Sequence, residues 1–159
     1  MATETMNALT MLEEDHRKVK ELLTELESTT ERGVQTRQRL FATIKGELTV
    51  HEIIEEEIFY PELKSHPKAE EIVLEGFEEH HVVDLLMGEL EQLDVSDETW
   101  GPKAKVMKEN IEHHIEEEEG EMFKAARQVF EKEELEDLGT RMEERKKSAA
   151  QETGVPLSA

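Results

Sequence analysis

Apolar residues recur at helical spacing along most of this chain, and this periodicity constrains its fold more than any other feature. Four long segments carry it, at about residues 7–30, 35–64, 68–93 and 102–130, and a further amphipathic stretch follows from residue 131. Four long helices joined by short connections favour an up-down-up-down arrangement. We therefore predict an all-α fold, an antiparallel up-down-up-down four-helix bundle with an extra short C-terminal helix.

The length of 159 residues favours a single domain with a core of its own. We assign residues 1–147 to the bundle and its C-terminal helix. The last stretch, SAAQETGVPLSA at 148–159, is typical of a frayed chain end, so we expect a flexible tail there. A helical bundle says little about function by itself, so function must be sought in the side chains that the helices point inward.

Acidic residues outnumber basic ones by 40 to 19, which gives a net charge of −21. This charge repels nucleic acid and anionic membranes, so we expect neither as a partner, whereas it suits cations. The chain has no cysteine, so any metal must be held by histidine and carboxylate. The first residues, MATETMNALT, form no apolar signal region, and no apolar run approaches the roughly 20 residues that span a bilayer. We therefore expect a cytoplasmic protein.

The second and fourth helical segments repeat each other with an offset of 63 residues. His51 falls on His114 and Glu55 falls on Glu118, so both segments place a histidine and a glutamate at positions i and i+4 of one helix face. Apolar residues lie seven and three positions before each histidine and again after each glutamate. The two pairs therefore continue the buried stripe. His113 fits a poorer stripe, and we expect it at the helix boundary or beside a ligand.

The first and third segments repeat each other with an offset of 64 residues. His16 falls on His80 and Val19 falls on Val83, so a histidine again replaces one member of an apolar stripe. His81 lies about 100° of helix away from this stripe and is the weaker candidate. Each of the four long segments thus offers one inward histidine, and two of them add an inward glutamate.

Four imidazoles and two carboxylates in one core would cost several kcal/mol unless something pairs with them, and a metal provides that pairing. Nitrogen and oxygen ligands without sulfur suit iron, manganese, zinc or copper, and six protein ligands exceed what one tetrahedral zinc needs. Two carboxylates on opposing helices could each bridge two ions, which favours a dinuclear centre. The predicted metal ligands are His16, His51, Glu55, His80, His114 and Glu118. A purely structural bundle would instead tolerate the loss of these histidines.

The sequence resembles the hemerythrin-like family, also called the HHE cation-binding domain, over about residues 9–130. Four stretches carry the resemblance: DHRKVKELLTEL around His16, HEIIEEEIFYP from His51, EEHHVVDLLMGEL around His80 and HHIEEEEGEMF from His113. The resemblance implies an antiparallel four-helix bundle that holds a non-haem, oxo- or hydroxo-bridged pair of iron ions, and manganese or zinc would also suit the ligands. It further implies that the centre binds or reacts with O2, NO or peroxide.

By position, the resemblance makes the four inward histidines terminal ligands and makes Glu55 and Glu118 bridges between the metals. The chain departs from oxygen-carrying hemerythrins at Gly76, where those proteins have a further histidine. This leaves room for water, an exogenous ligand, or a carboxylate such as Glu52 or Glu79. Such an open iron pair is less suited to reversible oxygen carriage than to reaction with oxygen.

The sequence leaves enzymatic activity open, with weak peroxide decomposition or iron oxidation as the reactions that an open iron pair would support. The alternative is a metal-dependent sensor or interaction module without turnover, for which the sequence identifies no protein partner. Tyr60 lies close to the second segment's ligands along the chain. We expect it to be a boundary aromatic with a solvated hydroxyl group.

Overall fold

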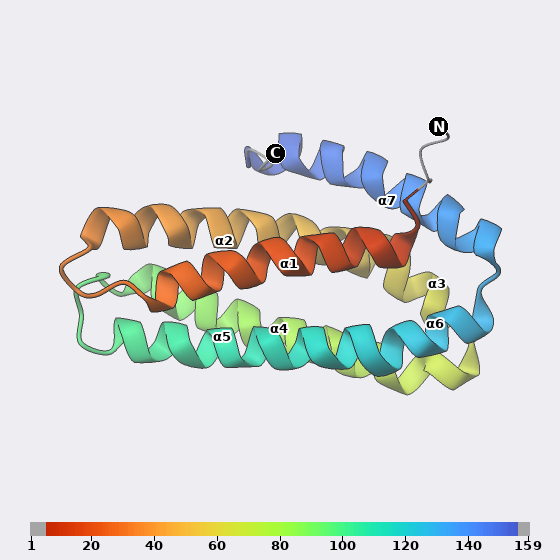
Figure 1. Cartoon of the computed structure of the whole chain (residues 1–159), viewed down its shortest axis with the longest axis horizontal. Coiled ribbons are helices and arrows are strands. Elements are labelled where there is room, and N and C mark those ends of the chain that lie inside the picture. Colours follow the sequence, from red (N-terminus) through yellow and green to blue (C-terminus); the bar gives the residue numbers. More distant parts are fainter. Residues whose placement is uncertain (1–5, 156–159) are drawn as a thin grey trace.

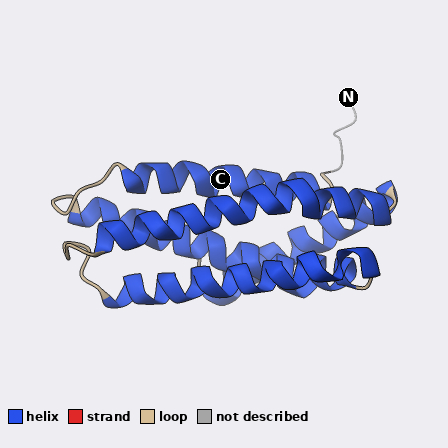
Figure 2. Ribbon diagram, turned by 90° about the horizontal axis from the view of Figure 1, so that it is seen from below, coloured by secondary structure: helices blue, strands red, loops and turns tan. Residues whose placement is uncertain are grey.

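A computed structural model of the protein describes residues 6–155. Within this range, four long helical segments run antiparallel to one another, and a further helix lies along one side of the bundle (Figure 1). The four segments are α1 (Ala8–Glu27); α2 (Val34–Ile54) with η1 (Glu55–Phe59) and α3 (Tyr60–Lys64); α4 (Glu70–Gln92), which follows the short η2 (Pro67–Ala69); and α5 (Trp100–Glu117) with η3 (Glu118–Met122) and α6 (Phe123–Val129). The further helix is α7 (Lys132–Thr153). The described part contains helices and loops without strands (Figure 2).

Local sequence signals set several of the helix ends. The Asn7 side chain accepts a hydrogen bond of 3.0 Å from the backbone N–H of Thr10 and so caps the start of α1. Glu131 and Glu134 form a reciprocal capping box at the start of α7. Gly154, with φ of +70°, ends α7 in the left-handed conformation that glycine adopts without strain. These caps fix where α1 and α7 begin and where α7 ends.

Two π-helical turns interrupt the second and fourth segments at the repeated glutamates. The turn η1 begins at Glu55 and η3 begins at Glu118, so the repeat in the sequence is also a repeat of backbone geometry. A π turn bonds residues five apart instead of four, and such turns are frequent at functional sites. Both turns therefore mark the level in the bundle at which a site is expected.

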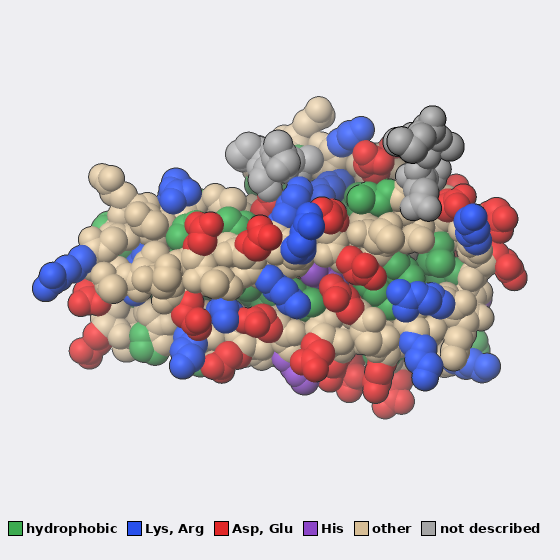
Figure 3. Space-filling view, viewed as in Figure 1, with side chains coloured by type: hydrophobic (Ala, Val, Ile, Leu, Met, Phe, Trp, Pro, Cys, Tyr) green, Lys and Arg blue, Asp and Glu red, His purple; other side chains and the backbone are tan. Residues whose placement is uncertain are grey.

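The large apolar side chains form two clusters at different levels of the bundle. One cluster includes Leu12 and Phe59, and the other includes Val19 and Trp100. In α1, His16 lies between the two clusters, buried with only 3% of its surface exposed. Charged side chains of both signs are spread over the face of the molecule seen in Figure 3. The core is thus divided by a buried polar layer.

The predicted all-helical bundle with an added C-terminal helix is confirmed. The predicted tail boundary is wrong for its first part, because α7 continues through residues 148–153. There Ala149 is fully buried against Val50, and small side chains let the helix approach α2 closely. Residues 156–159 of the predicted tail lie outside the described part of the chain.

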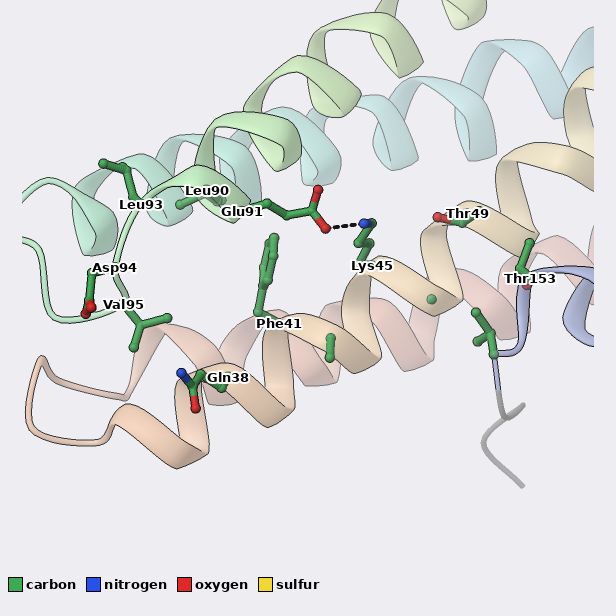
Figure 4. Close-up of a pocket in the computed structure, with 13 residues that line it drawn as sticks. Gln38, Phe41, Lys45, Thr49, Leu90, Glu91, Leu93, Asp94, Val95 and Thr153 are labelled. Carbon is green, nitrogen blue, oxygen red and sulfur yellow. Dashed lines mark hydrogen bonds and ion pairs between the residues drawn. The ribbon is translucent and has the colours of Figure 1, made fainter.

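Between residues 6 and 155, none of the helices is both long and apolar enough to pass through a membrane. A surface groove of about 760 Å³ lies between α2, α4 and the end of α7 (Figure 4). An ion pair between Lys45 and Glu91 crosses it. The predicted metal ligands do not line this groove, so we sought the functional site inside the bundle.

Candidate metal centre

All six predicted ligands meet in the buried polar layer between the two apolar clusters. Their side chains form two groups of four, and within each group the potential ligand atoms lie within 4.8 Å of one another. The first group is His16, His51, Glu55 and Glu118, and the second is Glu55, His80, His114 and Glu118. Both glutamates belong to both groups. This is the arrangement expected of two adjacent cation positions that share two bridging carboxylates.

Glu118 lies between the imidazoles of two different helices. Its Oε1 is 3.1 Å from Nε2 of His16, and its Oε2 is 3.1 Å from Nε2 of His114. The Glu118 side chain is fully buried. Each of its two oxygens faces one imidazole. The carboxylate spans the centre from α1 to α5.

Glu55 takes the equivalent place on the other side of the centre. Nε2 of His51 and Nε2 of His80 both lie 3.1 Å from its Oε1. The Glu55 side chain is also fully buried. The two glutamates therefore each contact one histidine of either group, as the sequence repeat predicts.

Several buried polar atoms of the centre lack a hydrogen-bond partner. They are Nε2 of His16, Nε2 of His51, both carboxylate oxygens of Glu55, and Oε1 of Glu118. Nε2 of His16 lies 3.1 Å from Oε1 of Glu118, and Nε2 of His51 lies 3.1 Å from Oε1 of Glu55. The angles at these contacts do not allow a hydrogen bond. Two ligands at right angles, each about 2.1 Å from one metal, would lie about 3.0 Å apart. The orphaned atoms and their spacing therefore fit a pair of bound metal ions.

The outer nitrogen of each imidazole, Nδ1, faces another carboxylate. The pairs are His16 with Glu119 at 2.7 Å, His51 with Asp15 at 2.9 Å, His80 with Glu56 at 2.7 Å, and His114 with Glu79 at 2.7 Å. A carboxylate that accepts a hydrogen bond from Nδ1–H fixes the orientation of the ring. Nε2 is then left to face the centre. All four histidines thus turn Nε2 towards the centre, as inward metal ligands would.

Asp15 is the most deeply buried of these outer carboxylates, with 4% of its surface exposed. Burial alone would raise its pKa, but hydrogen bonds from His51 and Lys146 lower that pKa to about 2. Sequence reasoning missed Asp15. Asp15 directly precedes His16 in the sequence, but its hydrogen bond is with His51. That contact depends on how α1 packs against α2.

The electrostatics of the centre show how strongly it attracts positive charge. Burial disfavours a charge on His114 and His80, but the facing carboxylates outweigh this effect and raise the two pKa values to about 10 and about 9. The pKa values of His16 and His51 are raised for the same reason. The facing carboxylates therefore favour positive charge in this centre.

Tyr60 was predicted to be a boundary aromatic with a solvated hydroxyl group, and this prediction is wrong. It is fully buried, and its hydroxyl donates a 2.6 Å hydrogen bond to Oε2 of Glu118. A Cβ atom added to Gly76 would lie only 3.0 Å from that hydroxyl oxygen. The phenol thus fills the space beside the position where oxygen-carrying hemerythrins have their additional histidine.

The π turn explains why the sequence pattern missed Tyr60. In an α-helix, Tyr60 would lie about 140° around the axis from Glu55, five residues earlier. A π turn brings residues five apart onto nearly the same face. Because η1 occupies residues 55–59, Tyr60 points into the centre with Glu55.

Several other candidates lie outside the six-residue centre. His81 and His113 are exposed, and Nε2 of His113 pairs with Glu117 at 3.1 Å on the surface. Glu79, considered as an extra ligand, contacts the outer nitrogen of His114. Glu52 is half-buried and forms a third group with Glu56 and the buried His80. These residues surround the centre without joining the two shared groups.

The fold and the centre define a class of protein: antiparallel helical bundles that enclose a buried centre of histidine and glutamate. The sequence matches the family model described as the hemerythrin HHE cation binding domain over residues 7–126. The chain belongs to this family, which confirms the resemblance seen in the four sequence stretches.

Two known proteins illustrate the relationship. A hemerythrin HHE cation-binding domain-containing protein from Mycobacterium kansasii has a similar crystal structure, with a TM-score of 0.81 and 27% identity, over 92% of this chain and 89% of that one. A protein named DNA nickase from Nostoc sp. (strain PCC 7120) is 27% identical over 149 residues. That match covers 94% of this chain but 42% of the relative, so this chain spans less than half of that protein's length.

Proposed function

We propose that this protein holds two iron ions and that the iron pair binds or reacts with O2, NO or peroxide. The observation that carries the proposal is the pair of four-residue groups that share Glu55 and Glu118. Each group would give one ion two imidazoles and two shared carboxylates, which suits iron and also suits manganese or zinc. When bound and reduced, an iron pair would supply electrons and an open coordination position to a small molecule.

The residues of this chain have distinct parts in the proposal. The imidazoles provide the terminal ligands, and their outer carboxylates hold each ring with Nε2 facing inward. Glu55 and Glu118 would bridge the two ions. Tyr60 holds Oε2 of Glu118 through its hydroxyl proton and occupies the space beside Gly76. A phenol in this place makes the centre less rich in nitrogen than that of an oxygen carrier.

A small cavity beside the centre supports a small ligand. It measures about 20 Å³, and four imidazoles, Glu52 and apolar side chains from all four helical segments line it. A cavity of this size accepts a molecule no larger than about one water. A diatomic molecule or peroxide is slightly larger than one water and needs only a small displacement of the lining side chains, whereas a larger organic substrate would need movement of the helices.

The proposal is tested by metal content and absorption. Protein purified without added metal is loaded with ferrous iron under anaerobic conditions and then exposed to air. We expect about two irons per chain, as the two shared ligand groups require, together with new near-ultraviolet charge-transfer bands. The decay of these bands on addition of peroxide would separate a reactive centre from a carrier. Protein that retains no stoichiometric metal and shows no new band would refute the proposal.

A metal-dependent sensor or interaction module without turnover is the second candidate. The observation that favours it is the ion pair that joins α7 to the surroundings of the centre, from Lys146 to Asp15. Iron-loaded protein that consumes no peroxide, but changes in α7 on loading, would favour this candidate. The net charge of −21 supports a protein without nucleic acid or membrane partners, and we also propose a cytoplasmic location.

A further inference from the structure

A chain of three side chains connects α7 to the candidate metal centre. Lys146 of α7 donates a 2.6 Å hydrogen bond from Nζ to Oδ1 of Asp15 in α1. The other oxygen of Asp15, Oδ2, lies 2.9 Å from Nδ1 of His51 in α2. The three residues come from three helices, and α7 lies across α1 and α2 (Figure 1).

This connection differs from those of the other three histidines. The outer carboxylates of Glu119, Glu56 and Glu79 have 35%, 37% and 25% of their side-chain surface exposed, so water can solvate them. The side chain of Asp15 is 5% exposed and that of Lys146 is 16% exposed. A buried carboxylate depends on its protein partners far more than a half-exposed one does. The orientation of His51 therefore depends on Lys146 through Asp15.

The two halves of α7 are held differently. Leu138 and Met142 in the first half belong to the large apolar cluster that also includes Phe59. The second half packs through a much smaller apolar cluster, which consists of Val50 from α2 and Ala149 and Ala150 from α7. The ionic contacts of α7 therefore carry more weight in its second half, where Lys146 lies.

We propose that Lys146 is a positioning residue for the metal centre, so that docking of the second half of α7 and metal occupancy stabilise each other. The inference rests on the proposed metal-binding function. Lys146 holds Asp15 in the position that orients His51, and an oriented His51 favours a bound metal. Coupling between two binding events is reciprocal, so a bound metal must strengthen the docking of α7 by the same factor. The helix would thus report whether the centre is loaded.

The test compares Lys146→Met with Lys147→Met. Both changes remove a lysine charge from α7 and keep much of the aliphatic chain, but Lys147 has 70% of its side chain exposed. Each protein is loaded with ferrous iron, and transfer of the iron to a coloured chelator is timed. Because loss of an outer hydrogen-bond partner typically weakens metal binding by about 10- to 100-fold, we expect release from Lys146→Met to be faster by at least about threefold. Release from Lys147→Met should match that from the wild type.

Amide hydrogen exchange over residues 143–153 provides a second readout. Iron loading should slow exchange there in the wild type and in Lys147→Met, but much less in Lys146→Met. Lys146→Arg, which keeps the charge and a donor, should restore slow iron release. This rescue separates positioning from a general loss of stability.

The outcomes distinguish the two proposals. A wild type that holds no iron would overturn both the metal-binding function and this inference. A wild type that holds two irons, with release and exchange unchanged in Lys146→Met, would overturn the inference alone. A Lys146→Met protein that released iron quickly but was not rescued by Lys146→Arg would show a structural effect and would also overturn it.

Discussion

At the residue scale, the centre depends on a glycine that faces a tyrosine. Gly76 on α4 leaves the space that the phenol of Tyr60 fills, and the contact is close enough that even a methyl group would press on the ring. Tyr60 in turn holds Glu118, one of the two shared carboxylates. The space beside Gly76 is therefore filled by a polar group, the phenol of Tyr60.

Gly76→Ala tests this contact, with Gly88→Ala in the same helix as the matched control. A Cβ atom at position 88 would meet nothing within 4 Å, so Gly88→Ala should stabilise the protein by about 0.5–1 kcal/mol through helix propensity. At position 76 the same gain is opposed by overpacking, which costs about 1–3 kcal/mol. We expect Gly76→Ala to be less stable than Gly88→Ala by about that amount in urea unfolding. Equal stabilities would show that Tyr60 moves away freely.

At the scale of the element, helical periodicity predicted which face of each segment is buried, because that face depends only on residues three and four apart. His51 and Glu55 could be placed on it for this reason. Periodicity could not reveal Tyr60, since the π turn changes the angle per residue within one segment. Periodicity also predicted the end of α7 too early. The alanines in its last buried turns have small side chains and give a weak apolar signal.

The second helical segment also contains a buried cation that the pattern did not predict. Arg37 near the start of α2 donates to the carbonyl oxygen of Val95 at 2.6 Å and to Oγ1 of Thr29 at 3.0 Å. Its guanidinium lies 5.1 Å from the ring centre of Trp100. One side chain therefore joins both connecting loops at this end of the bundle.

Arg37→Ala should lower the free energy of unfolding by about 2–4 kcal/mol, because hydrogen bonds from a charged donor contribute about 1.5–3 kcal/mol each and water that enters the space left by the side chain recovers part of this. Arg39→Ala changes the same residue type one half-turn further along α2, where the side chain is exposed. That control should change the free energy by no more than about 0.5 kcal/mol. Chemical denaturation followed by circular dichroism measures both. Similar small values for the two variants would contradict the role given to Arg37.

At the scale of the whole molecule, the centre combines residues that are close in the sequence with pairs that are far apart in it. The inward ligands follow from repeats within single helices, and they could be read from the sequence. The outer pairs could not, because each joins residues from two elements: His16 pairs with Glu119 across the bundle, and Asp15 is shared by His51 and Lys146. Such pairs are set by how the helices pack, and adjacent glutamates in the acidic runs are indistinguishable until that packing is known.

Metal-dependent stability tests the centre as a unit, since every segment of the bundle contributes a ligand. A ligand that binds only the folded state at 100 times its dissociation constant stabilises that state by about 2.7 kcal/mol. We expect ferrous iron, added anaerobically, to raise the unfolding free energy of the wild type by at least about this amount per tightly bound ion. Glu118→Gln keeps the shape of the side chain but removes the charge shared by both groups, so most of this gain should be lost.

Glu116→Gln is the matched control, because it makes the same chemical change on the exposed face of α5, two residues before Glu118. It should retain the full gain from iron, which excludes a general effect of lowering the negative charge of −21. If iron stabilised Glu118→Gln as much as the wild type, the shared carboxylate would not be a ligand. If iron stabilised neither the wild type nor Glu116→Gln, the buried histidines and glutamates would not form an iron site, and the proposed function would fail with this prediction.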